Sequence, residues 1–332
     1  MSRSDYIIRR IAWALATIVV VAVLNFFLFR VLPGDPAKAG VRDPRLTRDA
    51  QQAIRERFGL DKPLILNTTG NPFDSQFFRY FGNLLRGDLG ISYNFNRPVA
   101  ALLRERLMNT VLLVTIGNFL AIIIGIALGV AAAWRRGTII DIASLTFSLF
   151  TWALPTFFLG IILLIVGSTY LGLPVGGMRT SGRQYETFLE QAVDVGRHLF
   201  MPTVVLVVVL LGQFMLIMRS SLLEVLGEDY ILTAKAKGLS EAQIMRDHAM
   251  RPAMLPVITL IALTLGFTVS GSILIESVFS WPGIGSAVFE AVSRRDYPML
   301  QGAFLIITVS VILANTTADL MYAALDPRVR PA

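Results

Sequence analysis

The stretch LMNTVLLVTIGNFLAIIIGIALGVAAAW, residues 107–134, contains no Asp, Glu, Lys or Arg. The hydrocarbon core of a bilayer is about 30 Å thick, and a helix of roughly 20 apolar residues crosses it. The stretch therefore predicts a membrane-spanning helix.

Further uncharged runs of similar character occur on both sides of this stretch. They cover residues 11–29, 142–178, 198–218, 252–275 and 297–318. The run at 142–178 is too short for two crossings and a turn, and Gly and Pro residues interrupt its end. We expect one helix there, from about 142 to 170, with Pro155 as the point where it would bend. The sequence thus predicts an all-α integral membrane protein with six transmembrane helices.

Composition supports this fold class and excludes several functions. Hydrophobic residues make up 54% of the 332 residues and charged residues only 16%, compared with roughly a quarter charged in soluble domains. The chain has no cysteine and only two histidines, which excludes disulfide frameworks and Cys/His zinc sites. The net charge of +7 is typical of basic loops in a membrane protein, and we expect no nucleic acid partner.

The distribution of Lys and Arg predicts the orientation. Near the span ends, 12 lie in residues 1–10, 135–136, 219–251 and the tail, whereas five lie in the short loops of the opposite side. Flanking cations resist translocation, so both termini should be cytoplasmic. The apolar run 11–29 is longer than a signal-peptide core, and we expect it to be retained.

The cytoplasmic loop EDYILTAKAKGLSEAQIMRDHAM, residues 228–250, has the pattern helix, turn, helix. Asp229 is expected to cap the first helix, and Gly238 to end it in the left-handed conformation. Ser240 and Gln243 predict a capping box for a second helix, delimited by Pro252. Ala234 and Ala236 leave the first helix slender, which would let another protein approach its backbone. A structural hairpin without a partner is the alternative interpretation.

This loop, together with motifs along nearly the whole chain, resembles the first membrane subunit of dipeptide and oligopeptide importers of the type I ATP-binding-cassette (ABC) family. The matching motifs are Pro33-Gly34-Asp35-Pro36, Gly59-Leu60-Asp61-Lys62-Pro63, Gly87-Asp88-Leu89-Gly90, Asn109-Thr110, Pro155-Thr156-Phe157, Arg219-Ser220-Ser221, Tyr230 to Glu241, Glu276-Ser277-Val278-Phe279, Pro282-Gly283-Ile284-Gly285, Arg295-Asp296-Tyr297-Pro298 and Leu325-Asp326-Pro327-Arg328.

The resemblance implies the type I ABC importer permease fold in a bacterial cytoplasmic membrane. It implies that the loop couples the permease to an ATPase. The coupling residues would be Glu228, Asp229, Tyr230, Thr233, Ala234, Lys235, Ala236, Lys237, Gly238, Leu239, Ser240 and Glu241. The implied partners are a second homologous permease, two ATP-binding subunits or one fused ATPase, and an extracytoplasmic solute-binding protein.

The resemblance implies that the chain itself is non-catalytic and binds no cofactor, and the lack of a G-x-x-x-x-G-K-[ST] loop agrees with this. ATP and Mg would be bound by the partner ATPase subunits. The resemblance favours peptides as solutes, with nickel chelates, glutathione and sugars as alternatives within the same family.

Ionisable residues near the span ends are the remaining candidates for function. Arg30, Glu276 and Asp319 lie close to the ends of their spans, where long side chains can reach the interface. Glu276, with Phe279 three residues further on, is a candidate for the solute pathway or a gate.

The predicted organisation has four parts. Residues 1–32 form the N-terminal transmembrane helix, 33–105 an extracytoplasmic loop region, 106–325 the permease core with the coupling loop 228–250, and 326–332 a cytoplasmic tail. Within the loop region we expect an amphipathic helix from Thr47 to Phe58 and irregular structure elsewhere.

The sequence argues against two other classes of protein. A transporter driven by an ion gradient would show inverted repeats and an acid near the middle of a span, and we find no convincing example of either. An intramembrane enzyme would need a Ser/His pair, a metal cluster or paired aspartates, and no such group surrounds His198 or His248.

Overall fold

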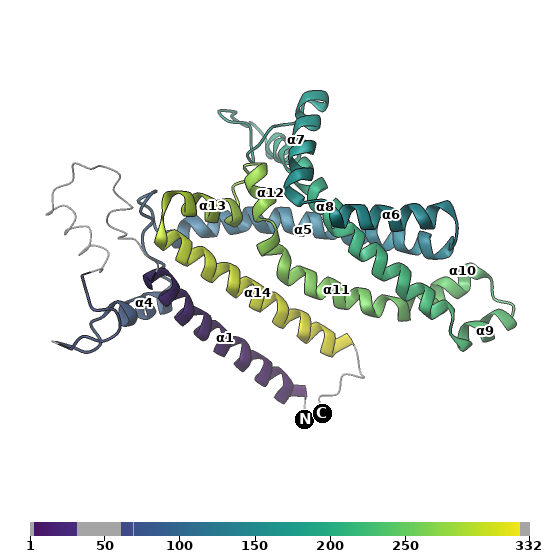
Figure 1. Ribbon diagram of the computed structural model, residues 1–332, viewed down its shortest axis with the longest axis horizontal. Coiled ribbons are helices and arrows are strands. Elements are labelled where there is room, and N and C mark those ends of the chain that lie inside the picture. The colour runs from purple at the N-terminus through teal and green to yellow at the C-terminus, as the bar shows by residue number, and fades with distance from the viewer. Residues whose placement is uncertain (1–2, 32–60, 69, 326–332) are drawn as a thin grey trace. The chain divides into compact units, whose positions relative to one another are not determined.

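The computed structural model describes residues 3–31, 61–68 and 70–325. The expected helix at Thr47–Phe58, the tail at 326–332 and the side chain of Asp319 lie outside this part. All secondary-structure elements named in the described ranges are helices, in agreement with the predicted class. In chain order (Figure 1) they are α1 (Arg3–Val31), α4 (Gln76–Leu85), α5 (Val99–Trp134), α6 (Ile139–Ala153), α7 (Thr156–Leu171), α8 (Phe188–Leu226), α9 (Asp229–Ala236), α10 (Glu241–Gln243), the π-helix η1 (Ile244–Ala249), α11 (Met250–Gly271), α12 (Ile273–Val278), α13 (Ile284–Arg294) and α14 (Tyr297–Leu325).

Four of these helices are long and apolar enough to cross a membrane within the described residues: α1, α5, α8 and α14. The consecutive helices α6 and α7 pass the same test together, as a bent pair. The predicted span at 252–275 overlaps α11, whose 22 residues have the length of a crossing, but it ends within the separate helix α12. The total of six transmembrane helices stays a prediction.

The expected single helix at 142–170 is instead the pair α6 and α7, which meet at an angle of 102°. Leu154 is extended, and Pro155 caps the start of α7. Proline disfavours a helical conformation of the residue before it and has no N–H for a helical hydrogen bond. Pro155 thus marks a helix boundary and not a gentle bend.

The described chain forms two compact units. The first consists of Met1–Asn109 with Pro282–Leu313, and the second of Thr110–Trp281 with Ala314–Ala332. Each has its own apolar interior.

In the first unit, α1 and α14 lie side by side (Figure 1), and the Phe29 and Phe304 rings are 5.7 Å apart. The helix α4 corrects our expectation of irregular structure in this region. The Ser75 hydroxyl caps its start, and its aromatic residues pack on α1, with the Phe77 ring 5.4 Å from that of Phe26.

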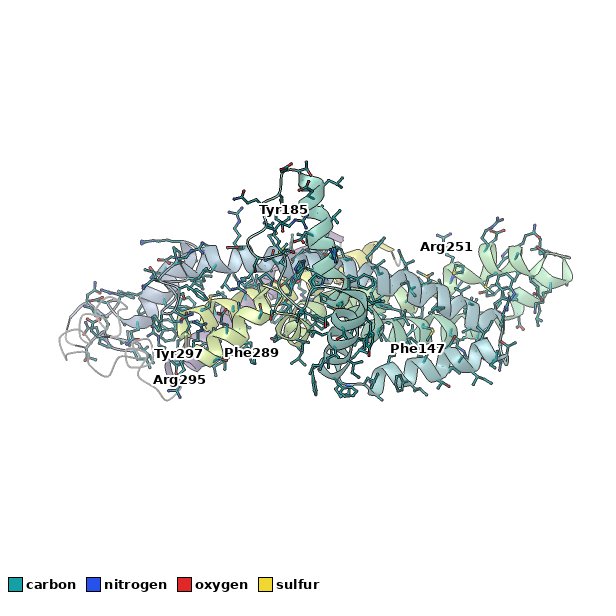
Figure 2. The ribbon with its side chains drawn as sticks, turned by 90° about the horizontal axis from the view of Figure 1, so that it is seen from above. Phe147, Tyr185, Arg251, Phe289, Arg295 and Tyr297 are labelled. Atoms are coloured by element: carbon teal, nitrogen blue, oxygen red, sulfur yellow. The ribbon has the colours of Figure 1, made fainter. Side chains whose placement is uncertain are left out.

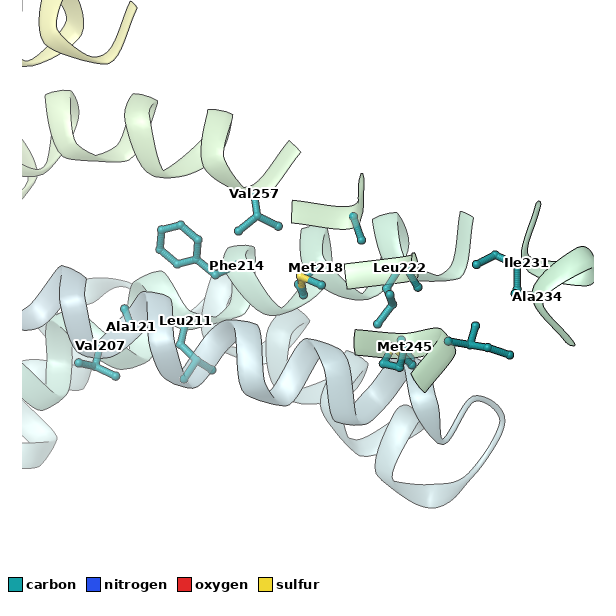
Figure 3. Close-up of a cluster of buried hydrophobic side chains, with 14 residues drawn as sticks. Ala121, Val207, Leu211, Phe214, Met218, Leu222, Ile231, Ala234, Met245 and Val257 are labelled. Atoms are coloured by element: carbon teal, nitrogen blue, oxygen red, sulfur yellow. The ribbon is translucent and has the colours of Figure 1, made fainter. Parts of the chain in front are cut away.

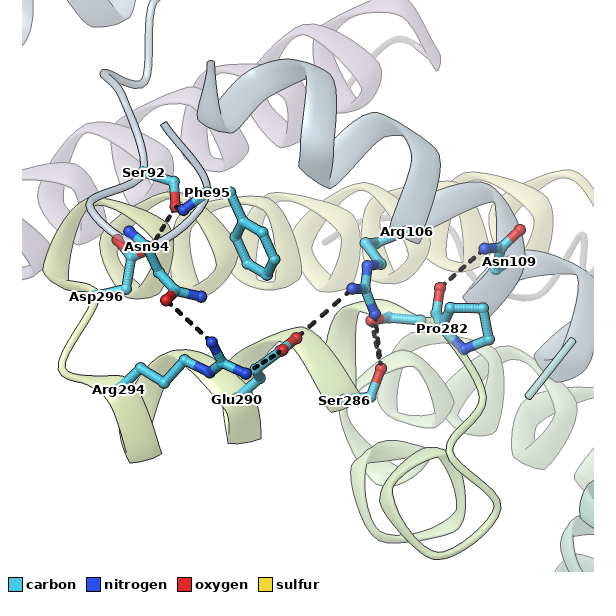
Figure 4. Close-up of polar contacts among 11 residues, drawn as sticks. Ser92, Asn94, Phe95, Arg106, Asn109, Pro282, Ser286, Glu290, Arg294 and Asp296 are labelled. Atoms are coloured by element: carbon cyan, nitrogen blue, oxygen red, sulfur yellow. Dashed lines mark hydrogen bonds and ion pairs between the residues drawn. The ribbon is translucent and has the colours of Figure 1, made fainter. Parts of the chain in front are cut away.

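A buried carboxylate organises the loop before α5 in the same unit (Figure 4). Asp296, just before α14, accepts hydrogen bonds from the Ser92 hydroxyl and from the backbone N–H groups of Tyr93, at 3.2 Å, and Asn94, at 3.1 Å. Arg106 of α5 lies 3.6 Å from Glu290 of α13. The hydrogen bonds to Asp296 hold residues 92–94 against the start of α14.

In the second unit, α6, α7 and α11 pack against α8. Helix α5 approaches α8 closely because small residues recur every four positions on its contact face. A Cβ atom on Gly125 would lie 2.7 Å from Cβ of Phe214, and one on Gly129 would lie 2.7 Å from the carbonyl oxygen of Met215. Glycine is used here because a side chain would push the helices apart.

The loop between α7 and α8 is tied to the start of α8. Tyr185, labelled in Figure 2, donates a hydrogen bond from its hydroxyl to Asp194 over 2.7 Å. The backbone N–H of Thr180 donates to the same carboxylate over 2.8 Å. Asp194 thereby gives this loop a defined conformation.

Candidate functional site

The predicted coupling segment folds as two short helices that join α8 to α11. The first, α9, begins one residue earlier than a cap at Asp229 would require. Glu228 is the N-cap and makes no side-chain cap bond, whereas Asp229 lies in the first turn. The expected cap is therefore wrong, although a carboxylate in the first turn still suits the helix dipole.

Gly238 ends this helical turn in the left-handed conformation, as predicted, with φ = 78°. Its N–H donates to the Lys235 carbonyl over 2.9 Å. No atom lies within 4 Å of where its Cβ would be. The requirement for glycine here comes from backbone conformation and not from space.

The predicted capping box is also confirmed. The Ser240 backbone N–H donates to Gln243 Oε1 over 3.0 Å, and the Gln243 N–H donates to the Ser240 hydroxyl over 3.4 Å. Pro252 does not delimit this second helix, contrary to expectation. The chain continues through the π-helix η1 into α11, which contains Pro252 near its start. The wider π turn ends three residues before the proline, which cannot donate a hydrogen bond of its own.

One face of α9 belongs to the interior of the second unit (Figure 3). Ile231 is fully buried and Ala234 is 5% exposed, in one cluster with Leu222 of α8 and Met245 of η1. The slender face that we assigned to Ala234 and Ala236 is thus wrong for Ala234, which packs inward. Ala236 is exposed.

The other described side chains of α9 and of the turn after it are largely exposed. Tyr230 is 43% exposed and Leu232 is 59% exposed. The predicted residues Thr233, Lys235, Lys237, Ser240 and Glu241 are exposed as well. Leu232 is missing from the predicted coupling residues, although an apolar residue three positions from both Asp229 and Lys235 of a helix was a usable signal.

A cavity of about 140 Å³ lies beside this segment, between α9, α10 and the ends of α5 and α8. Trp134, Lys235 and Glu241 contribute to its lining. The exposed carboxylate of Asp247 accepts a hydrogen bond from Arg246 Nε over 2.7 Å, which lowers the pKa of Asp247. The segment therefore exposes apolar side chains together with charges of both signs.

Glu276 and Phe279 occupy a different part of the second unit. The Thr110 hydroxyl donates to Glu276 Oε1 over 2.7 Å, and the Ser272 hydroxyl donates to the same atom over 3.1 Å. Both Glu276 and Phe279 are buried, and the Phe279 carbonyl accepts a hydrogen bond from the N–H of Gly177. Phe279 belongs to an apolar cluster separate from that of α9, and Glu276 is held by the hydroxyls of Thr110 and Ser272.

No group of three or more His, Cys, Asp or Glu side chains in the described ranges could hold a metal ion.

Comparison with known proteins gives consistent results along the chain. Residues 125–331 match the family described as binding-protein-dependent transport system inner membrane component, and residues 3–114 match the N-terminal region of such membrane components. A protein of Brucella suis biovar 1 (strain 1330), which bears a provisional peptide permease name, is 37% identical over 98% of both chains.

The glutathione transport system permease protein GsiC of Escherichia coli (strain K12) is 35% identical, over 98% of this chain and 99% of its own. An inward-facing structure of the methionine ABC transporter MetNI has a TM-score of 0.54 at 17% identity. It covers 68% of this chain and 96% of its own, which supports the fold alone. The chain therefore belongs to the family of inner membrane components of binding-protein-dependent transport systems, the permeases of ABC importers.

Proposed function

We propose that the chain forms half of the translocation pathway of an ATP-driven importer for peptides, with glutathione-like peptides among the solutes. The observation that carries this proposal is the similarity over nearly the full length to a peptide permease and to a glutathione permease. Nickel chelates and sugars are alternative solutes of the same kind of importer.

The α9 segment would receive the movement of a partner ATPase. Tyr230 and Leu232 are exposed apolar side chains of α9, whereas Ile231 is embedded in the cluster that includes Leu222 of α8 and Ala253 of α11. A packed interior transmits displacement because it is not readily compressed. A push on the exposed face would therefore move α8 and α11, which are covalently continuous with the segment.

The proposed assembly contains a second homologous permease, two ATP-binding subunits or one fused ATPase that bind ATP and Mg, and an extracytoplasmic solute-binding protein. It would lie in the bacterial cytoplasmic membrane, with six crossings and both termini of this chain in the cytoplasm. Glu276 and Phe279 are proposed gate residues. Both side chains are buried within this chain, Glu276 in α12 and Phe279 just after it. This supports a role in which a rearrangement of α12 opens or closes the pathway to the solute.

The coupling role can be tested by truncating the exposed face of α9. Tyr230→Ala and Leu232→Ala should each weaken ATPase association about tenfold, because central apolar side chains contribute roughly 1–2 kcal/mol at such interfaces. Phe188→Ala, at an exposed aromatic residue far along the sequence, is the matched control and should retain association. Co-purification and solute-stimulated ATP hydrolysis are the measurements.

Gly238→Val provides a second test, since valine resists the left-handed conformation by roughly 1–2 kcal/mol. The variant should insert into the membrane and pair with the second permease, yet lose ATPase association or stimulated hydrolysis. Normal coupling in well-inserted Gly238→Val, together with unchanged association of the α9 variants, would refute the coupling role.

A further inference from the structure

A polar cavity of about 200 Å³ lies within the first unit. It is formed by the end of α1, by α4, by the loop at residues 88–93 and by the start of α14. Its polar lining includes Arg30 of α1, Arg79 and Tyr80 of α4, and Gln301 of α14. A volume of this size holds several water molecules or a small anion with part of its hydration.

The cavity contains an arginine that forms no ion pair with the part of the chain that the structure describes. Arg30 Cζ lies 5.8 Å from the centre of the Phe26 ring, and none of the carboxylates in the described ranges forms an ion pair with Arg30. Arg79, by contrast, is paired with Asp74 at 3.0 Å. A partly buried charge without a counter-charge is unfavourable, and binding of an anion would remove that cost.

The acidic and phenolic groups around the cavity do not supply this counter-charge. Asp88 lines the cavity but is exposed, and it accepts a hydrogen bond from the Gly90 N–H over 2.8 Å. Asp296 is engaged with the Ser92 hydroxyl and the loop backbone. Burial raises the pKa of Tyr93 to about 12, so its hydroxyl stays neutral.

Two buried polar atoms of the same cavity also lack a hydrogen-bond partner among the described residues. Gln301 Nε2 and the Tyr80 hydroxyl form no hydrogen bond of normal geometry with the described residues, although the hydroxyl lies next to the side chains of Asn25 and Gln301. Buried donors are usually satisfied, and leaving one without an acceptor costs about 1–3 kcal/mol. A ligand with several acceptor oxygens would satisfy both atoms and Arg30 together.

The position of the cavity indicates where such a ligand comes from. Arg30 is the last residue of the apolar span Asp5–Arg30, so it lies at the edge of the hydrocarbon layer. Beside it, α4 has exposed apolar residues at its end and just before its start, with Leu85 88% and Phe73 66% exposed. Basic groups next to apolar surface at this depth match the phosphate and the acyl chains of a phospholipid.

We propose that the cavity lined by Arg30, Tyr80 and Gln301 binds a phosphate group, supplied by the headgroup of an anionic phospholipid or by free phosphate. Arg30 is the charged ligand of this site, and Tyr80 and Gln301 donate to the phosphate oxygens. The site is independent of the proposed coupling segment.

The test measures phosphate binding to the full chain, purified with its partner permease in detergent. Three probes are compared by native mass spectrometry or calorimetry: short-chain phosphatidylglycerol, phosphatidylcholine with the same acyl chains, and inorganic phosphate. We expect Arg30→Gln to weaken phosphatidylglycerol binding about tenfold, the effect of losing a charge-assisted hydrogen bond. Arg86→Gln is the matched control, because it removes an equal charge from exposed Arg86, outside the cavity, and should change binding less than twofold.

Gln301→Glu gives a second variant that keeps the size of the side chain. It places a carboxylate in the cavity, where it should block phosphate binding while Arg30 remains, without lowering the unfolding temperature. Binding of phosphatidylglycerol that depends on Arg30 and Gln301 identifies the lipid as the source. The same dependence for inorganic phosphate, without preference for phosphatidylglycerol over phosphatidylcholine, identifies free phosphate. Equal weakening by Arg30→Gln and Arg86→Gln, or no effect of Arg30→Gln and Gln301→Glu on any probe, would overturn the proposal.

Discussion

Arg219 Nη2 donates to Asp141 Oδ2 over 2.9 Å, and this ion pair joins the first turn of α6 to the last third of α8. The same carboxylate oxygen accepts a hydrogen bond from the Gly137 N–H over 3.0 Å. Asp141 thereby links the turn before α6 to α8, which leads directly into the proposed coupling segment.

Replacing one member of this pair should destabilise the second unit. Asp141→Asn leaves the Arg219 guanidinium without its counter-charge and should lower the free energy of unfolding by about 2 kcal/mol. Thermal unfolding of the purified permease checks this change. The double variant Asp141→Asn with Arg219→Gln should lose less than the sum of the single variants, because the two residues interact directly. Additive losses would contradict the assignment of this pair as a structural link.

The close approach of α5 and α8 predicts strong sensitivity at Gly129. Gly129→Ala would place Cβ 2.7 Å from the Met215 carbonyl oxygen, so the helices must separate, at a cost of roughly 1–3 kcal/mol. Gly196→Ala in α8 is the control, because no atom lies within 4 Å of that added Cβ. It should be neutral or stabilise by up to about 1 kcal/mol, as alanine favours a helix. Equal unfolding temperatures of the two variants would show that this helix contact is looser than the structure indicates.

The predicted topology can be tested with single cysteines, since the native chain has none. Ser181 lies in the loop between α7 and α8, Ser240 precedes α10, and both are exposed. With both termini cytoplasmic, an impermeant thiol reagent applied to intact cells should label Ser181→Cys and leave Ser240→Cys unlabelled. Labelling of both in permeabilised cells is the control. Reversed labelling would invert the orientation and remove the basis for ATPase docking at α9.

Local rules were sufficient where the determining contacts span only a few residues. The left-handed stop at Gly238 and the capping box of Ser240 and Gln243 were predicted correctly, because each depends on backbone groups within four positions. The predicted N-cap of α9, Asp229, was wrong by one residue, because the N-cap is Glu228. Both residue types can precede a helix, so the sequence alone did not distinguish them. The prediction that Pro252 ends the second helix was wrong, because the wider π turn before it accommodates a residue that cannot donate a hydrogen bond.

The sequence also held a signal that we did not use. Gly117, Ala121, Gly125 and Gly129 recur every four residues in α5, and each faces α8 or lies in its apolar cluster. Such spacing of small residues is typical of closely packed membrane helices. Similarly, the aromatic residues at 76–85 were an unused signal for the amphipathic helix α4, where we expected irregular structure.

By itself the sequence determined the helical class, the position of the long apolar helices and the turn chemistry of the coupling segment, because hydrophobic length and capping act locally. Only the tertiary structure decided that α6 and α7 meet at 102°, that Ala234 packs inward whereas Leu232 faces outward, and that Arg30 opens into a cavity with Gln301. These features depend on contacts between residues far apart in the chain. Arg30 and Gln301 are 271 positions apart, and no local pattern could have placed them in one site.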